Sequence, residues 1–254
     1  MNIPRITLSG VFLFVLMVII GPSGISAQNP SGDEILRKID MNMSSDTQVL
    51  KSKMVIHGRR GSRTIESRSW NEGESKAFSE YLSPAREKGT KMLKLEDKLW
   101  IYSPSTDRII RISGHMLRQS VMGSDLSYED MLEDSRLRNK YKAEVTGTEA
   151  VDGRNCLVVE LTAVVKDVSY YRMKLWVDNE RWIPLKEELF ARSGKLIKRL
   201  ELKNIENIDG RWFPKRMIFK DMLKSGEGTE FIIEDIEFNR EIPAHIFSKA
   251  SLRK

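Results

Sequence analysis

The sequence is poor in the residues that build most reactive sites and covalent cross-links. Its 254 residues include one cysteine, Cys156, and three histidines. A lone cysteine cannot form an internal disulfide, so the stability of the fold must come from a packed core. His57, His115 and His245 share no short spacing with cysteine or carboxylates, as a metal site would require. The sequence therefore predicts no metal site.

Catalytic and cofactor motifs are also missing. There is no HExxH or CxxC motif, no glycine-rich phosphate loop and no GxSxG nucleophile elbow. We therefore expect no catalytic residues, no cofactor and no enzymatic activity. A lipid-modifying hydrolase, the remaining enzymatic hypothesis, would need a catalytic set assembled from residues that are distant in the sequence.

The formal charge is nearly balanced. The 42 lysine and arginine residues exceed the 36 acidic residues by +6, and the two signs alternate through most of the chain. This pattern is typical of solvated strand faces and argues against nucleic acid as a partner. One basic cluster, residues 57–63, could attract anionic lipid head groups, since each cation near such a surface contributes about 1 kcal/mol. A solvated hairpin tip is the simpler interpretation of this cluster.

The first 27 residues have the order of a secretory signal peptide. Arg5 precedes an apolar run over residues 6–20, and small residues follow over 21–27. The apolar run is shorter than the roughly 20 residues that a membrane-spanning helix needs, so we expect cleavage near Ala27. No cysteine stands at this point to carry acyl chains. The expectation is a periplasmic protein whose mature chain, residues 28–254, forms one domain free in solution.

The mature chain begins with a predicted helix and continues as a long antiparallel sheet. Ser31 and Glu34 have the spacing of a capping box, and apolar residues then recur at helical intervals to Met43. From about residue 48, short segments alternate apolar and polar residues between turn signals, which predicts roughly eleven strands. A sheet of that width must curl because twist accumulates from strand to strand. The expected fold class is mainly β (α+β), an incomplete barrel covered by the N-terminal helix and a helical lid.

The predicted lid is the stretch from about residue 113 to 140, where helical spacing interrupts the alternation. We expect it to lie across the concave side of the sheet and to enclose an apolar cavity. Methionine adapts to irregular apolar shapes, which suits acyl chains. The candidate ligand-binding residues are Trp100, Tyr102, Met116, Met122, Tyr128, Met131 and Leu132.

Acidic residues also gather in this stretch. They are Asp125, Glu129, Asp130, Glu133 and Asp134. At helical spacing they are interpreted as the solvated face of an amphipathic helix rather than as paired catalytic carboxylates.

Several motifs in order along the chain resemble one known family. Residues 89–94 precede Trp-Ile-Tyr-Ser-Pro at 100–104, and residues 122–130 read Met-Gly-Ser-Asp-Leu-Ser-Tyr-Glu-Asp. Residues 176–178 with 184–186, 210–214 with Met217, and 247–248 continue the match. The chain resembles, from about residue 33 to 252, the outer-membrane lipoprotein-sorting protein family of the LolA/LolB-like superfamily.

The resemblance implies an incomplete β-barrel with an apolar cavity and a function in carrying lipid. The leading hypothesis is a monomeric periplasmic shuttle that takes a lipid or an acylated lipoprotein from an inner-membrane transporter toward an outer-membrane acceptor. The alternative is a periplasmic adaptor of an inner-membrane lipid or RND-type exporter that carries no ligand. Neither hypothesis requires covalent chemistry.

Overall fold

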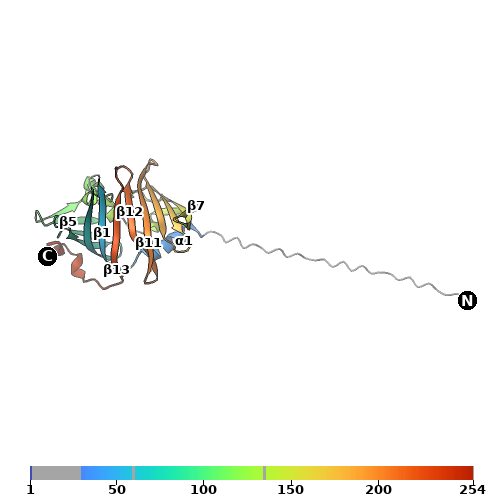
Figure 1. Ribbon diagram of the computed structural model, residues 1–254, viewed down its shortest axis with the longest axis horizontal. Coiled ribbons are helices and arrows are strands. Elements are labelled where there is room, and N and C mark those ends of the chain that lie inside the picture. Colours follow the sequence, from blue (N-terminus) through green and yellow to red (C-terminus); the bar gives the residue numbers. More distant parts are fainter. Residues whose placement is uncertain (2–29, 59–60, 134–135, 254) are drawn as a thin grey trace.

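The structure is a computed structural model that describes residues 1, 30–58, 61–133 and 136–253 (Figure 1). Apart from Met1, the predicted signal peptide lies outside the described residues, and so does Asp134. No helix within the described ranges is long and apolar enough to cross a membrane.

Most of the described chain forms one antiparallel sheet of 13 strands. The strands are β1 (Thr47–Gly58), β2 (Gly61–Glu72), β3 (Lys76–Ser83), β4 (Lys91–Leu95), β5 (Lys98–Ser103), β6 (Arg108–Ile112), β7 (Tyr141–Val151), β8 (Arg154–Ala163), β9 (Arg172–Asp178), β10 (Pro184–Phe190), β11 (Leu196–Ile208), β12 (Arg211–Asp221) and β13 (Thr229–Phe238). The expected fold class is confirmed, with two strands more than the roughly eleven predicted.

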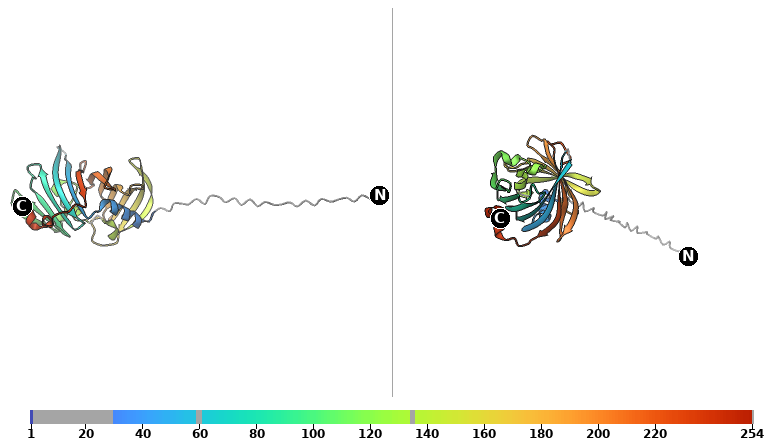
Figure 2. Two further views of the ribbon diagram at one scale, coloured as in Figure 1. Left: turned by 90° about the horizontal axis from the view of Figure 1, so that it is seen from below. Right: turned by 60° about the vertical axis from the view of Figure 1, so that its left-hand side comes forward.

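The sheet curls without closing. Its spatial order is β6-β5-β4-β3-β2-β1-β13-β12-β11-β10-β9-β8-β7, so β6 and β7 form the two open edges although they are consecutive in the sequence. The chain between them, residues 113–140, passes from one edge to the other (Figure 2). We call this segment the insertion. The insertion lies on the concave side of an incomplete barrel, as the sequence predicts.

The strand alternation and the tight turns follow directly from the residues. Met173, Leu175 and Val177 of β9 share the inner face and are at most 6% exposed. The two-residue turns Asp152–Gly153 and Asp209–Gly210 have positive φ at both positions, between 49° and 81°. Asp and Gly tolerate this conformation, and it matches the twist of the flanking hairpin strands.

The N-terminal helix α1 (Gly32–Met43) covers one half of the concave side. Ser31 caps it by accepting a hydrogen bond from the Glu34 backbone amide at 3.2 Å, which confirms the predicted cap. Ile35 and Leu36 are fully buried and pack with the inner residues of β7–β9. The predicted helix is confirmed, and its apolar stripe joins one main core cluster.

The C-terminal segment packs on a separate cluster of the sheet. After β13 come the 3₁₀ turns η4 (Ala244–Phe247) and η5 (Lys249–Arg253). Phe247 and Leu252 are buried against Phe78 of β3 and Leu93 of β4. This packing covers part of the sheet that the insertion does not contact.

Candidate ligand-binding site

The insertion is built from short helical pieces. They are η1 (Gly114–Arg118), η2 (Val121–Gly123), α2 (Tyr128–Leu132) and η3 (Leu137–Asn139). Ser127 and Asp130 form a reciprocal capping box at the start of α2. Met122 and Gly123 both have positive φ, 52° and 76°, and this kink separates η2 from α2. No residue of α2 is fully buried.

The insertion covers the half of the sheet formed by β1–β6. Its apolar residues are half-buried apart from Val121, which is 3% exposed, and they pack on a cluster that includes Met54, Ile65 and Met92. Five of the predicted site residues meet here: Met116, Met122, Tyr128, Met131 and Leu132. They form the underside of a cover, and none of them lines the cavity that lies beside α1.

Trp100 and Tyr102 do not lie with the insertion, and this part of the prediction is wrong. In β5, Leu99 and Ile101 belong to the cluster under the insertion, whereas Trp100 and Tyr102 pack with the C-terminal segment. Successive side chains of a strand point to opposite faces. Trp100 and Tyr102 therefore face the C-terminal segment, while the alternate residues of β5 face the insertion. The ammonium of Lys249 lies 4.5 Å from the Trp100 ring centroid.

A cavity lies between α1, the insertion and strands β9–β12. It has a volume of about 270 Å³. Its lining residues are Ile39, Met43, Asp130, Glu133, Leu137, Tyr141, Tyr170, Met173, Leu175, Pro184, Glu187, Leu189, Lys198, Leu200 and Phe219. Most of this surface is apolar, and the polar members stand mainly where the insertion meets the sheet.

Asp130 ties α2 to the far half of the sheet. Its carboxylate pairs with the ammonium of Lys198 on β11 and accepts a hydrogen bond from the Tyr170 hydroxyl at 2.5 Å. Burial opposes ionisation of Asp130, but the Lys198 charge and the hydrogen bonds outweigh it and hold the pKa below its usual value. These contacts form a charged link across the cavity, and we call Asp130, Lys198 and Tyr170 the latch.

Two further acidic residues anchor the insertion. Glu133 accepts hydrogen bonds from the Ser169 hydroxyl at 2.6 Å and from Lys140 at 2.9 Å. Asp125 accepts from the Thr229 hydroxyl at 2.8 Å and from the Asp221 amide at 2.9 Å.

The interpretation of these acids as a solvated helix face is therefore wrong. It assumed that helical spacing continues through residues 125–134, but the helix α2 has only 5 residues, Tyr128–Leu132. The backbone on each side of α2 turns away from a helical path, so the side chains of Asp125, Asp130 and Glu133 face strands and loops of the sheet rather than water.

Glu187 is a site residue that the sequence analysis missed. It stands on β10 opposite Leu175 of β9 and Leu200 of β11, both of which line the cavity. Burial raises the pKa of its carboxyl to about 7. Its place in the cavity follows from its pairing with inner-facing leucines on both neighbouring strands. The sequence alone does not show this pairing.

The arrangement offers binding rather than evident chemistry. In the described ranges, no group of three or more His, Cys, Asp or Glu residues is placed to hold a metal ion. Cys156 is buried, and this burial raises the pKa of its thiol to about 11, which makes it a weak nucleophile. His57 pairs with Glu230 at 2.9 Å, away from the cavity lining.

Comparison with known proteins agrees with the geometry. A family model described as "Uncharacterized protein" matches residues 73–254. No curated protein matches the chain. A LolA superfamily protein from Nitrosomonas europaea is 26% identical, with a TM-score of 0.72 over 87% of this chain and 99% of its own.

Two other solved structures share the fold. A domain from Vibrio parahaemolyticus that is described as an outer membrane lipoprotein-sorting protein domain has a TM-score of 0.76 at 24% identity. The match covers 88% of this chain and 98% of that domain. A DUF1329 family protein from Desulfovibrio piger has a TM-score of 0.78 at 24% identity, covering 87% and 97%. The chain belongs to the family that the matching family model describes, and its open sheet, insertion and concave cavity give it the fold of the LolA superfamily.

Proposed function

We propose that this protein is a periplasmic carrier that binds the acyl chain of a lipid or lipoprotein in its concave cavity and moves it toward the outer membrane. The single observation that carries the proposal is the apolar cavity beneath an insertion with no fully buried residue in α2. Export rests on the predicted signal peptide. An inner-membrane donor and an outer-membrane acceptor are the partners that such a route requires.

The size of the cavity supports a cover that opens. Pockets for small ligands usually measure about 300–1,000 Å³, and this one measures about 270 Å³. A long acyl chain therefore needs additional space, which displacement of the insertion would supply. The latch is a buried pair, since the side chains of Lys198 and Asp130 are 6% and 16% exposed. In such a pair the cost of removing both charges from water offsets most of their attraction, so returning the pair to water as the insertion lifts has a low net cost.

Ligand transfer then needs no covalent step. An acyl chain that occupies the cavity competes with the insertion for the same apolar surface, so binding shifts the population toward the open state. The release step requires an acceptor with higher affinity for the ligand than this cavity has.

Native mass spectrometry of the protein purified from its own periplasm tests the proposal. We expect a co-purifying lipid or acylated protein. The variant Leu200→Trp fills the cavity from β11 and should lower ligand occupancy about tenfold, the equivalent of 1.4 kcal/mol of lost binding.

The matched control is Glu201→Trp. Glu201 is the next residue of β11 and points to the opposite face of the sheet, so the same added volume should leave ligand occupancy unchanged. A wild-type protein that is always empty, and that binds no fluorescent fatty acid in solution, would contradict the carrier proposal and favour the adaptor.

A further inference from the structure

The turns of the sheet fall on two rims of different charge. Because every strand is antiparallel to its neighbours, successive turns alternate between the two ends of the strands. One end, which we call the acidic rim, carries the turns β2–β3, β4–β5, β7–β8, β9–β10 and β11–β12. The other end, the basic rim, carries β1–β2, β3–β4, β5–β6, β8–β9, β10–β11 and β12–β13, and is uppermost in Figure 1.

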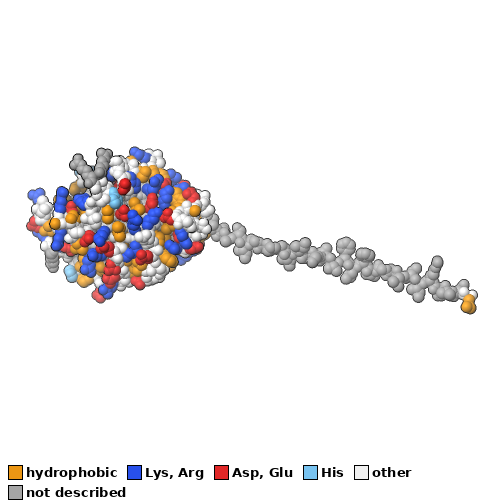
Figure 3. All heavy atoms as spheres, in the orientation of Figure 1, with side chains coloured by type: hydrophobic (Ala, Val, Ile, Leu, Met, Phe, Trp, Pro, Cys, Tyr) orange, Lys and Arg blue, Asp and Glu red, His pale blue; other side chains and the backbone are white. Residues whose placement is uncertain are grey.

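The charges of these turns differ in sign. The five turns of the acidic rim contain one base, Arg181, and these acids: Glu74, Glu96, Asp97, Asp152, Glu180 and Asp209. Figure 3 shows acidic side chains, in red, along this lower edge. The described turns of the basic rim contain the acids Glu87, Asp107, Asp167 and Glu227 and these bases: Arg86, Lys88, Lys166, Arg192, Lys195 and Lys224.

The basic rim also carries exposed apolar side chains. Val164 and Val165 of the β8–β9 turn are 64% and 40% exposed, and Met222 and Leu223 of the β12–β13 turn are 38% and 57% exposed. Other large exposed apolar residues of the described domain are Met41 and Ile110. Two exposed apolar pairs on turns of one rim, beside cations, match the composition of segments that enter a membrane interface.

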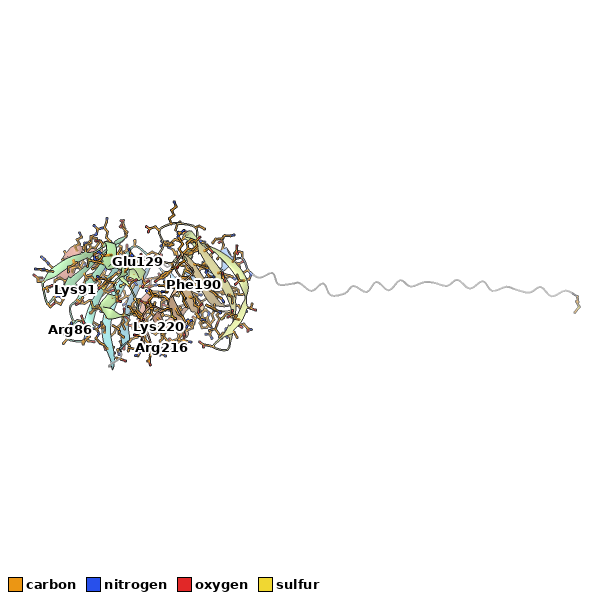
Figure 4. All side chains as sticks on the ribbon, turned by 90° about the horizontal axis from the view of Figure 1, so that it is seen from above. Arg86, Lys91, Glu129, Phe190, Arg216 and Lys220 are labelled. Carbon is orange, nitrogen blue, oxygen red and sulfur yellow. The ribbon has the colours of Figure 1, made fainter. Side chains whose placement is uncertain are left out.

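The same two turns hold the insertion in place. Ser169 and Tyr170 of the β8–β9 turn bind Glu133 and Asp130. Lys224 of the β12–β13 turn donates to the carbonyl oxygen of Ser124 at 2.7 Å and to the hydroxyl of Ser120. Figure 4 looks down on this rim and shows Glu129 of the insertion between Arg86 on one half of the sheet and Phe190 on the other.

From these placements we propose that the basic rim is a docking surface for an anionic lipid bilayer. The valine pair and the Met222–Leu223 pair enter the head-group region, and the lysines and arginines of neighbouring turns contact lipid phosphates. The acidic rim points away from the bilayer, because a net negative charge is repelled by an anionic surface. Docking thus orients the molecule with one end of its strands toward the membrane.

Docking also loosens the insertion. The ammonium of Lys224 already contacts Ser120, Ser124 and Asp221, so a lipid phosphate that binds it competes with these contacts. Movement of the β8–β9 turn also displaces Tyr170 from Asp130. The cavity therefore opens where lipid is present. This coupling rests on the proposed carrier function, whereas the docking itself does not.

Vesicle sedimentation tests the proposal. We expect the protein purified from periplasm to bind vesicles of phosphatidylglycerol and phosphatidylethanolamine, and to bind pure phosphatidylcholine vesicles far more weakly. The double variants V164S/V165S and M222S/L223S should each lower binding to the anionic vesicles about tenfold or more. R192Q/K195Q should lower it about 25-fold, the product of about fivefold for each cation near the surface.

Matched controls lie away from the basic rim. Ile110→Ser removes an exposed apolar side chain from the edge strand β6, and R240Q/K98Q removes the same formal charge near the acidic rim. Both should bind the vesicles like wild type, and thermal unfolding should show that every variant is folded.

Several outcomes would overturn the docking surface. They are the absence of binding to anionic vesicles, a loss of binding in the controls equal to that in the rim variants, or vesicle binding that both serine variants leave intact. Binding of a fluorescent fatty acid without vesicles separates the two proposals. M222S/L223S should still bind the fluorescent fatty acid. If the wild-type protein does not bind it, the carrier function is refuted, whereas the result with vesicles still stands.

Discussion

The two covers of the concave side, α1 and the insertion, are held by different forces. α1 buries Ile35 and Leu36 completely in the cluster of β7–β9, so it is part of the core. The insertion rests on half-buried side chains and is tied down by Asp130 and Glu133 through charged contacts. Exposing a buried apolar side chain to water loses its full hydrophobic stabilisation, whereas a buried ion pair that returns to water regains the hydration of both charges, so the net cost is low. The comparison indicates one permanent cover and one releasable cover.

The largest expected effect comes from a charge placed in the permanent core. Leu175→Glu, at a fully buried position of β9, introduces an unpaired carboxylate and should prevent cooperative folding, since the cost is on the order of several kcal/mol. Met131→Glu, on half-buried α2, should lower the free energy of unfolding by only about 1 kcal/mol and abolish lipid binding. Thermal unfolding by circular dichroism checks both. If the two variants unfold equally, the insertion is ordinary core.

The next effect concerns the burial of α1. Leu36→Ala should lower the free energy of unfolding by about 2–5 kcal/mol because it leaves a cavity against the sheet. Met41→Ala, on the same helix at a position 64% exposed, is the control and should change it by less than about 0.5 kcal/mol. Denaturation in urea measures the difference. Equal values would mean that α1 is not integral to the core.

A smaller effect is expected at the latch. Asp130→Asn leaves Lys198 without its carboxylate, but release of the insertion lets the ammonium reach water, which limits the cost to about 1–2 kcal/mol. The free protein should then bind an apolar fluorescent dye more strongly, and amide exchange should rise in residues 114–133. The double variant D130N/K198M removes both charges and should regain part of the stability. A loss of about 3–5 kcal/mol without added dye binding would instead indicate a locked buried pair.

The smallest effect is a pH dependence from Glu187. Its carboxyl has a pKa of about 7 in the fold against an ordinary value of 4.5, so the folded state holds a proton that the unfolded state releases. The free energy of unfolding should fall as pH rises from about 4.5 to about 7. Solvent partly reaches this residue, so we expect a fall of about 1–2 kcal/mol.

Glu187→Gln is the matching variant, since the amide cannot ionise. It should lack this fall and be more stable than wild type at pH 8, as measured by urea denaturation at both pH values. Asp130 and Glu133 titrate below this window because their pKa values are lowered, so they do not contribute to it. If the free energy of unfolding of the wild-type protein does not change between pH 4.5 and 7, the carboxyl of Glu187 is not buried in the cavity.

Much of the architecture was predictable because it depends on local patterns. The capping serine before α1, the alternation of Met173, Leu175 and Val177, and the aspartate-glycine turns each act within a few residues. Such short-range preferences identified the helix, the curled sheet and the insertion.

The contacts that make the site depend on residues far apart in the chain. Asp130 meets Lys198 across 68 positions, and Asp125 meets Thr229 across 104. No local preference encodes such pairs, because strand order and register decide which side chains face each other. The same register separates Trp100 from the insertion and directs Glu187 into the cavity. Residue patterns therefore determined the elements, and only the strand order and the curling of the sheet determined which charges meet.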